Sequence, residues 1–154
     1  MLTTSYKLLL FGHLLAVVAL VGSSIGSHVL ALRARAAGPA RTAAFLDDVE
    51  WLGRRLQAPA ALLVVVFGVW LGASQGFRFA DAWLVLGLVG FAVCFVLVAG
   101  YLGPATARVR QLIAQRGADD PAVPAGVRRV LTVSRIELAV LVAIMLDMVV
   151  KPGA

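Results

Sequence analysis

Four long apolar stretches divide the chain, and shorter polar segments separate them. They cover residues 8–32, 58–74, 82–102 and 130–150, which are 25, 17, 21 and 21 residues long. A helix needs about 20 apolar residues to cross the hydrocarbon core of a bilayer, within a range of about 17–25. The stretches are continuous, without the alternation of a membrane β-barrel. We therefore expect an all-α membrane protein with four transmembrane helices in an antiparallel bundle, forming a single domain over residues 1–154.

The polar segment between the first two stretches carries a helical pattern of its own. Its apolar residues recur at intervals of four, three and four, at Phe45, Val49, Leu52 and Leu56. This spacing predicts a short amphipathic helix over about residues 41–57, lying at the cytoplasmic membrane interface and ending before Pro59. Residues 103–129 contain several prolines and glycines, so the second half of that segment is expected to be irregular.

The composition agrees with a lipid-facing protein. Hydrophobic residues make up 61% of the chain and charged residues 14%, with a mean hydropathy of +0.94. One small core cannot bury that excess, which excludes a soluble enzyme. Cys94 is the single cysteine, so it cannot form an internal disulfide. A cleaved signal peptide is the less favoured interpretation of the first stretch, because its apolar part exceeds the usual core of about 7–15 residues.

Arginine and lysine predict the orientation. The net charge is +6, and ten of the fourteen basic residues lie between stretches one and two or between stretches three and four. By the positive-inside rule, both of these segments are cytoplasmic and both termini face outward, in a bacterial cytoplasmic membrane. The partners expected for the arginines are anionic lipid headgroups. Nucleic acid is not an expected partner, because neither segment carries a recognition motif. The ten residues are Arg33, Arg35, Arg41, Arg54, Arg55, Arg108, Arg110, Arg116, Arg128 and Arg129.

Small residues recur at helical spacing within three of the stretches. Such seams let membrane helices approach closely, and they are also compatible with a homodimer or a partner in a membrane complex. Cys94 fits its seam as a small apolar residue, and a buried thiol is usually inert. The seams are Gly12, Ala16, Ala19, Ser23 and Gly26; Gly68, Gly72 and Gly76; and Gly87, Gly90 and Cys94.

Five ionisable residues lie inside the stretches, where such groups usually have a partner or a role. At about 1.5 Å per residue they form two layers. His13 and Asp147 belong to an outer layer, whereas His28, Arg135 and Glu137 belong to an inner one. In the inner layer an ion pair between His28 and Glu137 is expected, with Ser27 near Arg135.

Three interpretations of the outer layer remain open. His13 can hydrogen-bond Asp147 or a backbone carbonyl and so join the first and fourth helices. It can serve instead as an axial ligand of haem, through a neutral imidazole nitrogen. It can also bind Cu(I) together with Met145 or Met148, since imidazole and thioether both suit copper. No arrangement of catalytic residues stands out.

Three short motifs resemble a known group of proteins. They are Tyr-Lys-Leu-Leu-Leu-Phe-Gly-His-Leu-Leu-Ala at 6–16, Gly-Val-Trp-Leu-Gly at 68–72 and Met-Val-Val-Lys-Pro-Gly at 148–153. The chain resembles an uncharacterised family of predicted integral membrane proteins. It is also distantly similar to the copper-resistance D membrane domain and to haem-containing membrane protoporphyrinogen oxidases.

The resemblance implies that His13 corresponds to a first-helix histidine that binds haem iron, and that Lys151 and Pro152 correspond to a closing lysine-proline. The chain departs from the oxidases at Leu20, where they often have tryptophan, and it has no lysine in the third stretch. We therefore expect an accessory or cofactor-associated membrane subunit, without enzymatic activity of its own. The alternatives are a haem b-binding oxidoreductase resembling protoporphyrinogen oxidase and a copper-handling membrane protein.

Overall fold

The chain folds into long helices joined by short turns. The structure is a computed structural model that describes residues 4–76, 78 and 81–151, and all regular elements within them are helical. Six are α-helices and two are short π-helical segments. In chain order they are α1 (Thr4–Ala36), α2 (Pro39–Leu52), η1 (Gly53–Gln57), α3 (Ala58–Ser74), α4 (Ala82–Val96), η2 (Leu97–Leu102), α5 (Gly103–Arg116) and α6 (Ala122–Val150).

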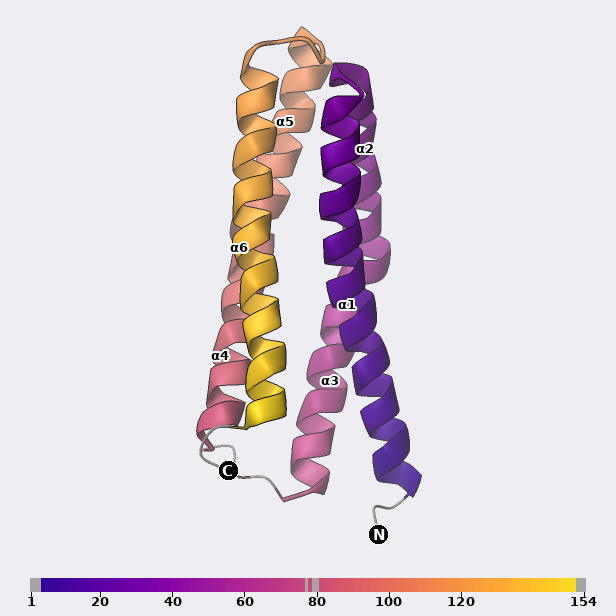
Figure 1. Ribbon diagram of the computed structural model, residues 1–154, viewed down its shortest axis with the longest axis vertical. Helices are drawn as coiled ribbons and strands as arrows, with labels where there is room; N and C mark the ends of the chain where they lie inside the picture. Colours follow the sequence, from indigo (N-terminus) through magenta and orange to yellow (C-terminus); the bar gives the residue numbers. More distant parts are fainter. Residues whose placement is uncertain (1–3, 77, 79–80, 152–154) are drawn as a thin grey trace.

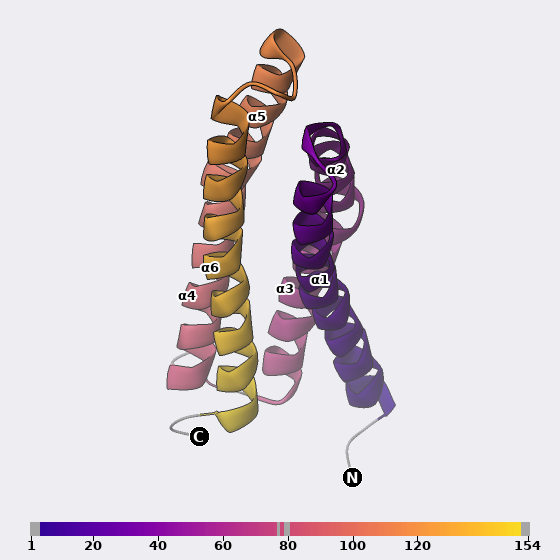
Figure 2. The same ribbon diagram turned by 45° about the horizontal axis from the view of Figure 1, so that its top comes forward.

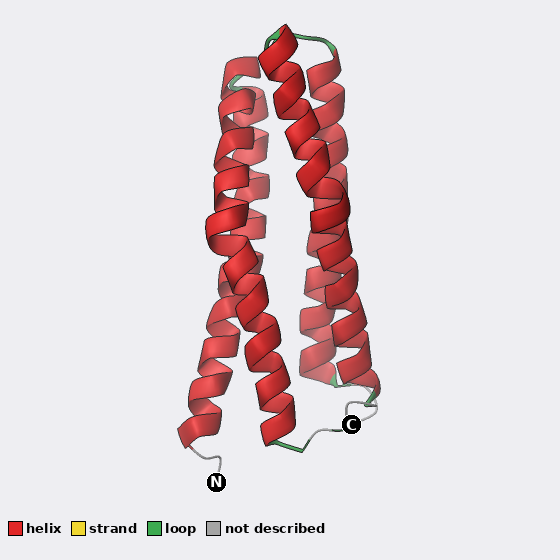
Figure 3. Ribbon diagram, turned by 180° about the vertical axis from the view of Figure 1, so that it is seen from behind, coloured by secondary structure: helices red, strands yellow, loops and turns green. Residues whose placement is uncertain are grey.

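The helices form two hairpins that stand side by side (Figure 1). In the N-terminal hairpin, residues 4–74, α1 packs against α2 and α3. In the C-terminal hairpin, residues 82–150, α6 packs against α4 and α5. The start of α1, the end of α3, the start of α4 and the end of α6 lie at one end of the molecule (Figures 1 and 3). We call this the terminal end, and we call the opposite end, with both hairpin turns, the arginine-rich end.

Two prolines explain the two π-helical segments. Pro59 and Pro104 each lie just after a π-helical segment, in the first turn of α3 and of α5. A proline ring lacks an N–H and clashes with the carbonyl four residues earlier, so the preceding turn widens. The helix axis therefore continues through both sites. The expected end of the amphipathic helix near residue 57 is wrong, because α2, η1 and α3 form one continuous helical segment over Pro39–Ser74.

Glycines with positive φ mark the two turns at the arginine-rich end. Gly38 has φ 105° and precedes Pro39, the first residue of α2, while Gly117 has φ 88° and terminates α5. Residues that have a Cβ are strained at such positive φ angles, whereas glycine adopts them freely. The second half of segment 103–129 is less irregular than expected, because only residues 117–121 lie outside α5 and α6.

Two buried clusters join the hairpins. The first lies toward the arginine-rich end and includes Ala31, Leu46, Val109 and Val127, from α1, α2, α5 and α6. The second lies further toward the terminal end and consists of Leu20, Ala60, Cys94 and Leu141. Direct contact between the hairpins runs through α2 with α5 and through α1 with α6. Among the described residues, the backbone of α3 approaches neither that of α4 nor that of α6, and Figure 2 shows the ribbon of α3 separate from that of α4.

Three helical segments within the described part of the chain are long and apolar enough to cross a membrane. They are Thr4–Ala36, Pro39–Ser74 and Ala82–Arg116. Many of their large apolar side chains are exposed, for example Phe11 at 64% and Phe95 at 66%, as expected for surfaces that face lipid. The helix α6 is not among these three segments, and its apolar part carries Arg135, Glu137 and Asp147. With 33 residues, α1 is about 50 Å long and exceeds a hydrocarbon core of about 30 Å.

Candidate functional site

The side chain of His13 on α1 packs against α3. Its Nδ1 lies 3.1 Å from the carbonyl oxygen of Val64 on α3. A Cβ at Gly68 would lie only 3.2 Å from Cε1 of His13, so the imidazole rests directly on the glycine. The carbonyl of residue 64 points along the helix toward residue 68, one turn on. Because Gly68 has no side chain, the ring of His13 can reach a carbonyl that a larger residue would cover.

This contact determines which nitrogen of His13 is available. A carbonyl oxygen only accepts hydrogen bonds, so Nδ1 carries the proton and donates it to Val64. The lone pair of the neutral ring is then on Nε2. Histidines that bind metals are commonly oriented in this way, by a hydrogen bond from the other ring nitrogen to a carbonyl or carboxylate. The preceding residue of α1 also fits closely, since a Cβ at Gly12 would lie 3.1 Å from Cε2 of Phe67.

The other residues of the outer layer belong to the C-terminal hairpin. Asp147 and Met148 face α4, where a Cβ at Gly87 would collide with Cε of Met148 and lie 3.7 Å from Oδ2 of Asp147. Oδ2 of Asp147 is buried without a hydrogen-bond partner among the described residues. Met145 is 41% exposed. Of the two expected partners of His13, the backbone carbonyl is confirmed, as that of Val64, and Asp147 is wrong, because the histidine packs against α3 and the aspartate against α4. The hydrogen bond therefore joins α1 to α3 and not to the fourth apolar stretch.

The inner-layer residues also make other contacts than expected. His28 uses Nδ1 to bond the carbonyl oxygen of Ser24 in its own helix, at 2.9 Å, and its Nε2 is buried without a partner among the described residues. The expected pair of His28 with Glu137 is therefore wrong. Glu137 is buried, at 6% exposure, next to Cys94, whose Sγ donates to the carbonyl oxygen of residue 137 at 3.8 Å. Arg135 is exposed.

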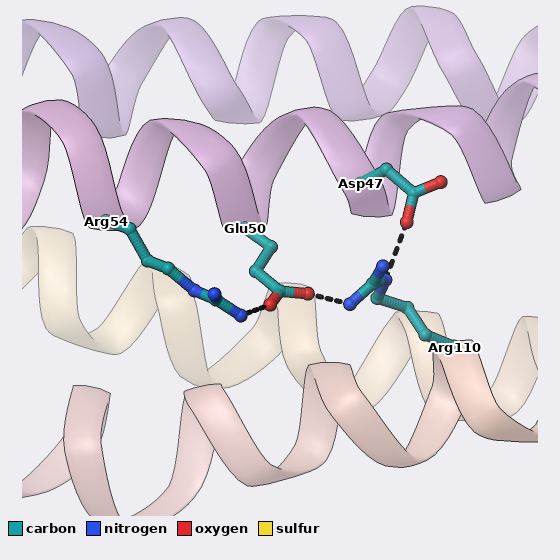
Figure 4. A network of polar contacts seen from close by, with 4 residues as sticks. All are labelled: Asp47, Glu50, Arg54 and Arg110. Carbon is teal, nitrogen blue, oxygen red and sulfur yellow. Dashed lines mark hydrogen bonds and ion pairs between the residues drawn. The ribbon is translucent and has the colours of Figure 1, made fainter.

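A charged network links α2 to α5 near the arginine-rich end (Figure 4). Arg110 bonds Oδ1 of Asp47 at 2.6 Å through Nε, and Glu50 through Nη1. Glu50 also pairs with Arg54, one turn further along the same helical segment. These residues, with Trp51 and Arg55, line an open hollow of about 270 Å³. The spacing of Asp47, Glu50 and Arg54 along α2 and η1 places them on one helix face, but the sequence contains no signal that Arg110 of α5 completes the network.

The described residues contain no group of three or more His, Cys, Asp or Glu side chains placed to hold a metal ion. A second and smaller cavity lies between α1, α2, α5 and α6, where Ser27, His28 and Ser134 contribute polar atoms to its wall. Ser27 therefore faces this cavity together with Ser134, the neighbour of Arg135 in the chain.

One comparison with known proteins gives a match. A family model with the description "Predicted integral membrane protein (DUF2269)" matches residues 7–152. No curated protein and no solved structure matches the chain. The matched region includes His13, the charged residues of α6 and nearly all of both hairpins.

Proposed function

The chain belongs to the DUF2269 family of predicted integral membrane proteins, and we propose that it is an accessory membrane subunit that holds a haem b-type cofactor through His13. The observation that carries this proposal is the packing of His13 against α3. Its Nδ1 is engaged by the carbonyl of Val64, so Nε2 remains available as an iron ligand. Bound haem would supply one-electron chemistry to the complex in which the subunit acts.

The proposal includes a fourth transmembrane helix, α6. Along its membrane half α6 packs against α4, with Ile144 above Gly90 and Met148 above Gly87. Because α4 lies in one of the three segments that can cross a bilayer, a helix packed along it runs through the same layer. Two charged residues of α6 are covered by packing, since Glu137 is buried and Asp147 faces α4. The third, Arg135, is exposed and lies nearer the arginine-rich end, where its long side chain can extend toward the membrane interface.

We place the arginine-rich end in the cytoplasm and the terminal end outside. The fold gathers both arginine-rich segments at one end, and the positive-inside rule assigns that end to the cytoplasmic side of a bacterial inner membrane. The long helices then project beyond the hydrocarbon core on this side. Arg54 and Arg55, close to Trp51, lie where anionic lipid headgroups can reach them.

The packing of His13 favours haem over copper as the group that this histidine binds. A Cu(I) site would need Met145 or Met148 beside the imidazole. Met148 packs on α4 in the C-terminal hairpin, whereas His13 packs on α3 in the N-terminal hairpin. His28 does not serve as a second axial ligand, because fifteen residues separate the two histidines, about 22 Å along one helix. Haem would therefore have His13 as its only histidine ligand from this chain.

Absorbance of the purified protein tests the proposal. Protein from a haem-replete host is expected to show a Soret band, with α and β bands after dithionite reduction. His13→Leu should lose these bands, whereas the matched variant His28→Leu should retain them, since His28 lies in the other polar layer. A wild-type spectrum without a Soret band, or full haem content in His13→Leu, would overturn the assignment.

A further inference from the structure

A small cavity lies where the two hairpins meet, toward the arginine-rich end. Its volume is about 40 Å³. Helices α1, α2, α5 and α6 all contribute to its wall. Several of its lining residues, including Leu46 and Val127, also belong to the first buried cluster, so the cavity lies beside that cluster. Apolar side chains such as Phe45 and Leu46 form most of the wall, and the polar residues that line it are Ser27, His28, Thr106 and Ser134.

Two polar atoms from α1 are buried at this cavity without a protein partner. Oγ of Ser27 and Nε2 of His28 have no hydrogen-bond partner among the described residues. Because Nδ1 of His28 donates to the carbonyl oxygen of Ser24, Nε2 of the neutral ring is an acceptor. A hydroxyl such as that of Ser27 can both donate and accept. The pair therefore offers a donor and two acceptors to whatever occupies the cavity.

The size and chemistry of the cavity suit water as its occupant. About 10–15 Å³ on this measure suffices for one molecule, and a buried water needs two to four polar partners. A cavity of about 40 Å³ is too small for a lipid chain or an organic cofactor. Leaving two polar groups unsatisfied in an apolar wall is unfavourable, and water satisfies them.

We propose that this cavity is a buried hydration site, in which water bound by Ser27 and His28 hydrogen-bonds α1 to the hydroxyls of Thr106 on α5 and Ser134 on α6. The link crosses from the N-terminal to the C-terminal hairpin. The two hairpins are otherwise joined at this level by apolar contacts and by the charged network of Arg110. The site is independent of haem binding at His13.

Radiolytic hydroxyl footprinting with mass spectrometry tests the site, because side chains beside buried water are oxidised although bulk solvent does not reach them. The full-length protein in nanodiscs is used. Leu46 and Leu141 are matched, since they are the same residue type and are 2% and 5% exposed. Leu46 lines the cavity and Leu141 belongs to the other buried cluster. We expect several-fold faster oxidation of Leu46, and equal rates for the two leucines would overturn the proposal.

Variants test whether the named atoms hold the water. Ser27→Ala should reduce the oxidation of Leu46, and Ser27→Ala with His28→Leu should reduce it to the rate of Leu141. The matched control is Ser74→Ala, since Oγ of Ser74 donates to the carbonyl of Leu71 and does not line the cavity. If the double variant does not fold, Ser27→Ala alone decides the question. An unchanged rate at Leu46 in either folded variant would contradict the assignment.

Discussion

Replacing Gly90 by alanine is expected to push α4 away from α6. A Cβ at position 90 would lie 2.8 Å from Cγ1 and 3.0 Å from Cδ1 of Ile144. Carbon atoms in proteins pack at about 3.5–4.0 Å, so the added methyl group does not fit unless Ile144 or the helix moves. Ile144 belongs to the shell around the buried cluster that contains Cys94 and Leu141, so its displacement disturbs that cluster.

The size of the effect follows from two opposing contributions. Overpacking by a methyl group typically costs about 1–3 kcal/mol, whereas alanine is a better helix former than glycine by about 1 kcal/mol. Gly22→Ala is the matched control, because Gly22 lies in the middle of α1 and a Cβ there has nothing within 4 Å. The two variants share the propensity gain, so the difference between them isolates the overpacking. At about 2–4 °C per kcal/mol, Gly90→Ala should unfold roughly 2–12 °C below Gly22→Ala.

The assay is thermal unfolding of detergent-purified protein, followed by circular dichroism. Ile144→Ala provides a second check, because it removes both atoms that the new methyl group would meet. The double variant Gly90→Ala, Ile144→Ala should be more stable than the sum of the single effects predicts. Equal melting temperatures for Gly90→Ala and Gly22→Ala, or strict additivity in the double variant, would refute the close packing of α4 on α6.

Three further predictions concern charge and topology. Glu50→Gln removes the ion pairs to Arg54 and Arg110. Since these groups are partly exposed, we expect the free energy of unfolding to fall by at most about 1 kcal/mol, and by less at high salt. A larger fall that is independent of salt would contradict this. Glu137→Leu should raise the melting temperature by about 2–4 °C, because Glu137 is buried and forms no ion pair with any described residue; a lower melting temperature would show that its carboxyl group has a partner. In spheroplasts, a membrane-impermeant maleimide should label Gln75→Cys but not Ala37→Cys, while buried Cys94 stays unlabelled; the opposite labelling would reverse the proposed orientation.

The all-helical class could be predicted because it depends on local properties of the chain. Runs of about 20 apolar residues must satisfy their backbone groups internally in lipid, so they form helices whatever they pack against. The second apolar stretch coincides with α3, Ala58–Ser74. The arginine asymmetry also follows from composition, and the fold collects the arginine-rich segments at one end.

Helix ends at proline could not be predicted from the sequence. Pro59 and Pro104 usually indicate a break, but here the preceding turns widen to π-helix and the axis continues. The choice depends on packing, because α2 lies on α1 and α5 lies on α6 throughout these turns. Tertiary contact keeps the segments collinear, and a propensity argument does not include it.

The partners of the polar residues were decided by tertiary structure alone. Counting about 1.5 Å per residue along each apolar stretch places His13 level with Asp147, and the two do lie in the same half of the molecule. Such a count does not determine how the helices are rotated or which of them are neighbours. His13 turns toward α3 because Gly68, fifty-five residues away in the chain, leaves the carbonyl of Val64 open. In the same way Arg110 meets Glu50 only because the hairpins stand side by side.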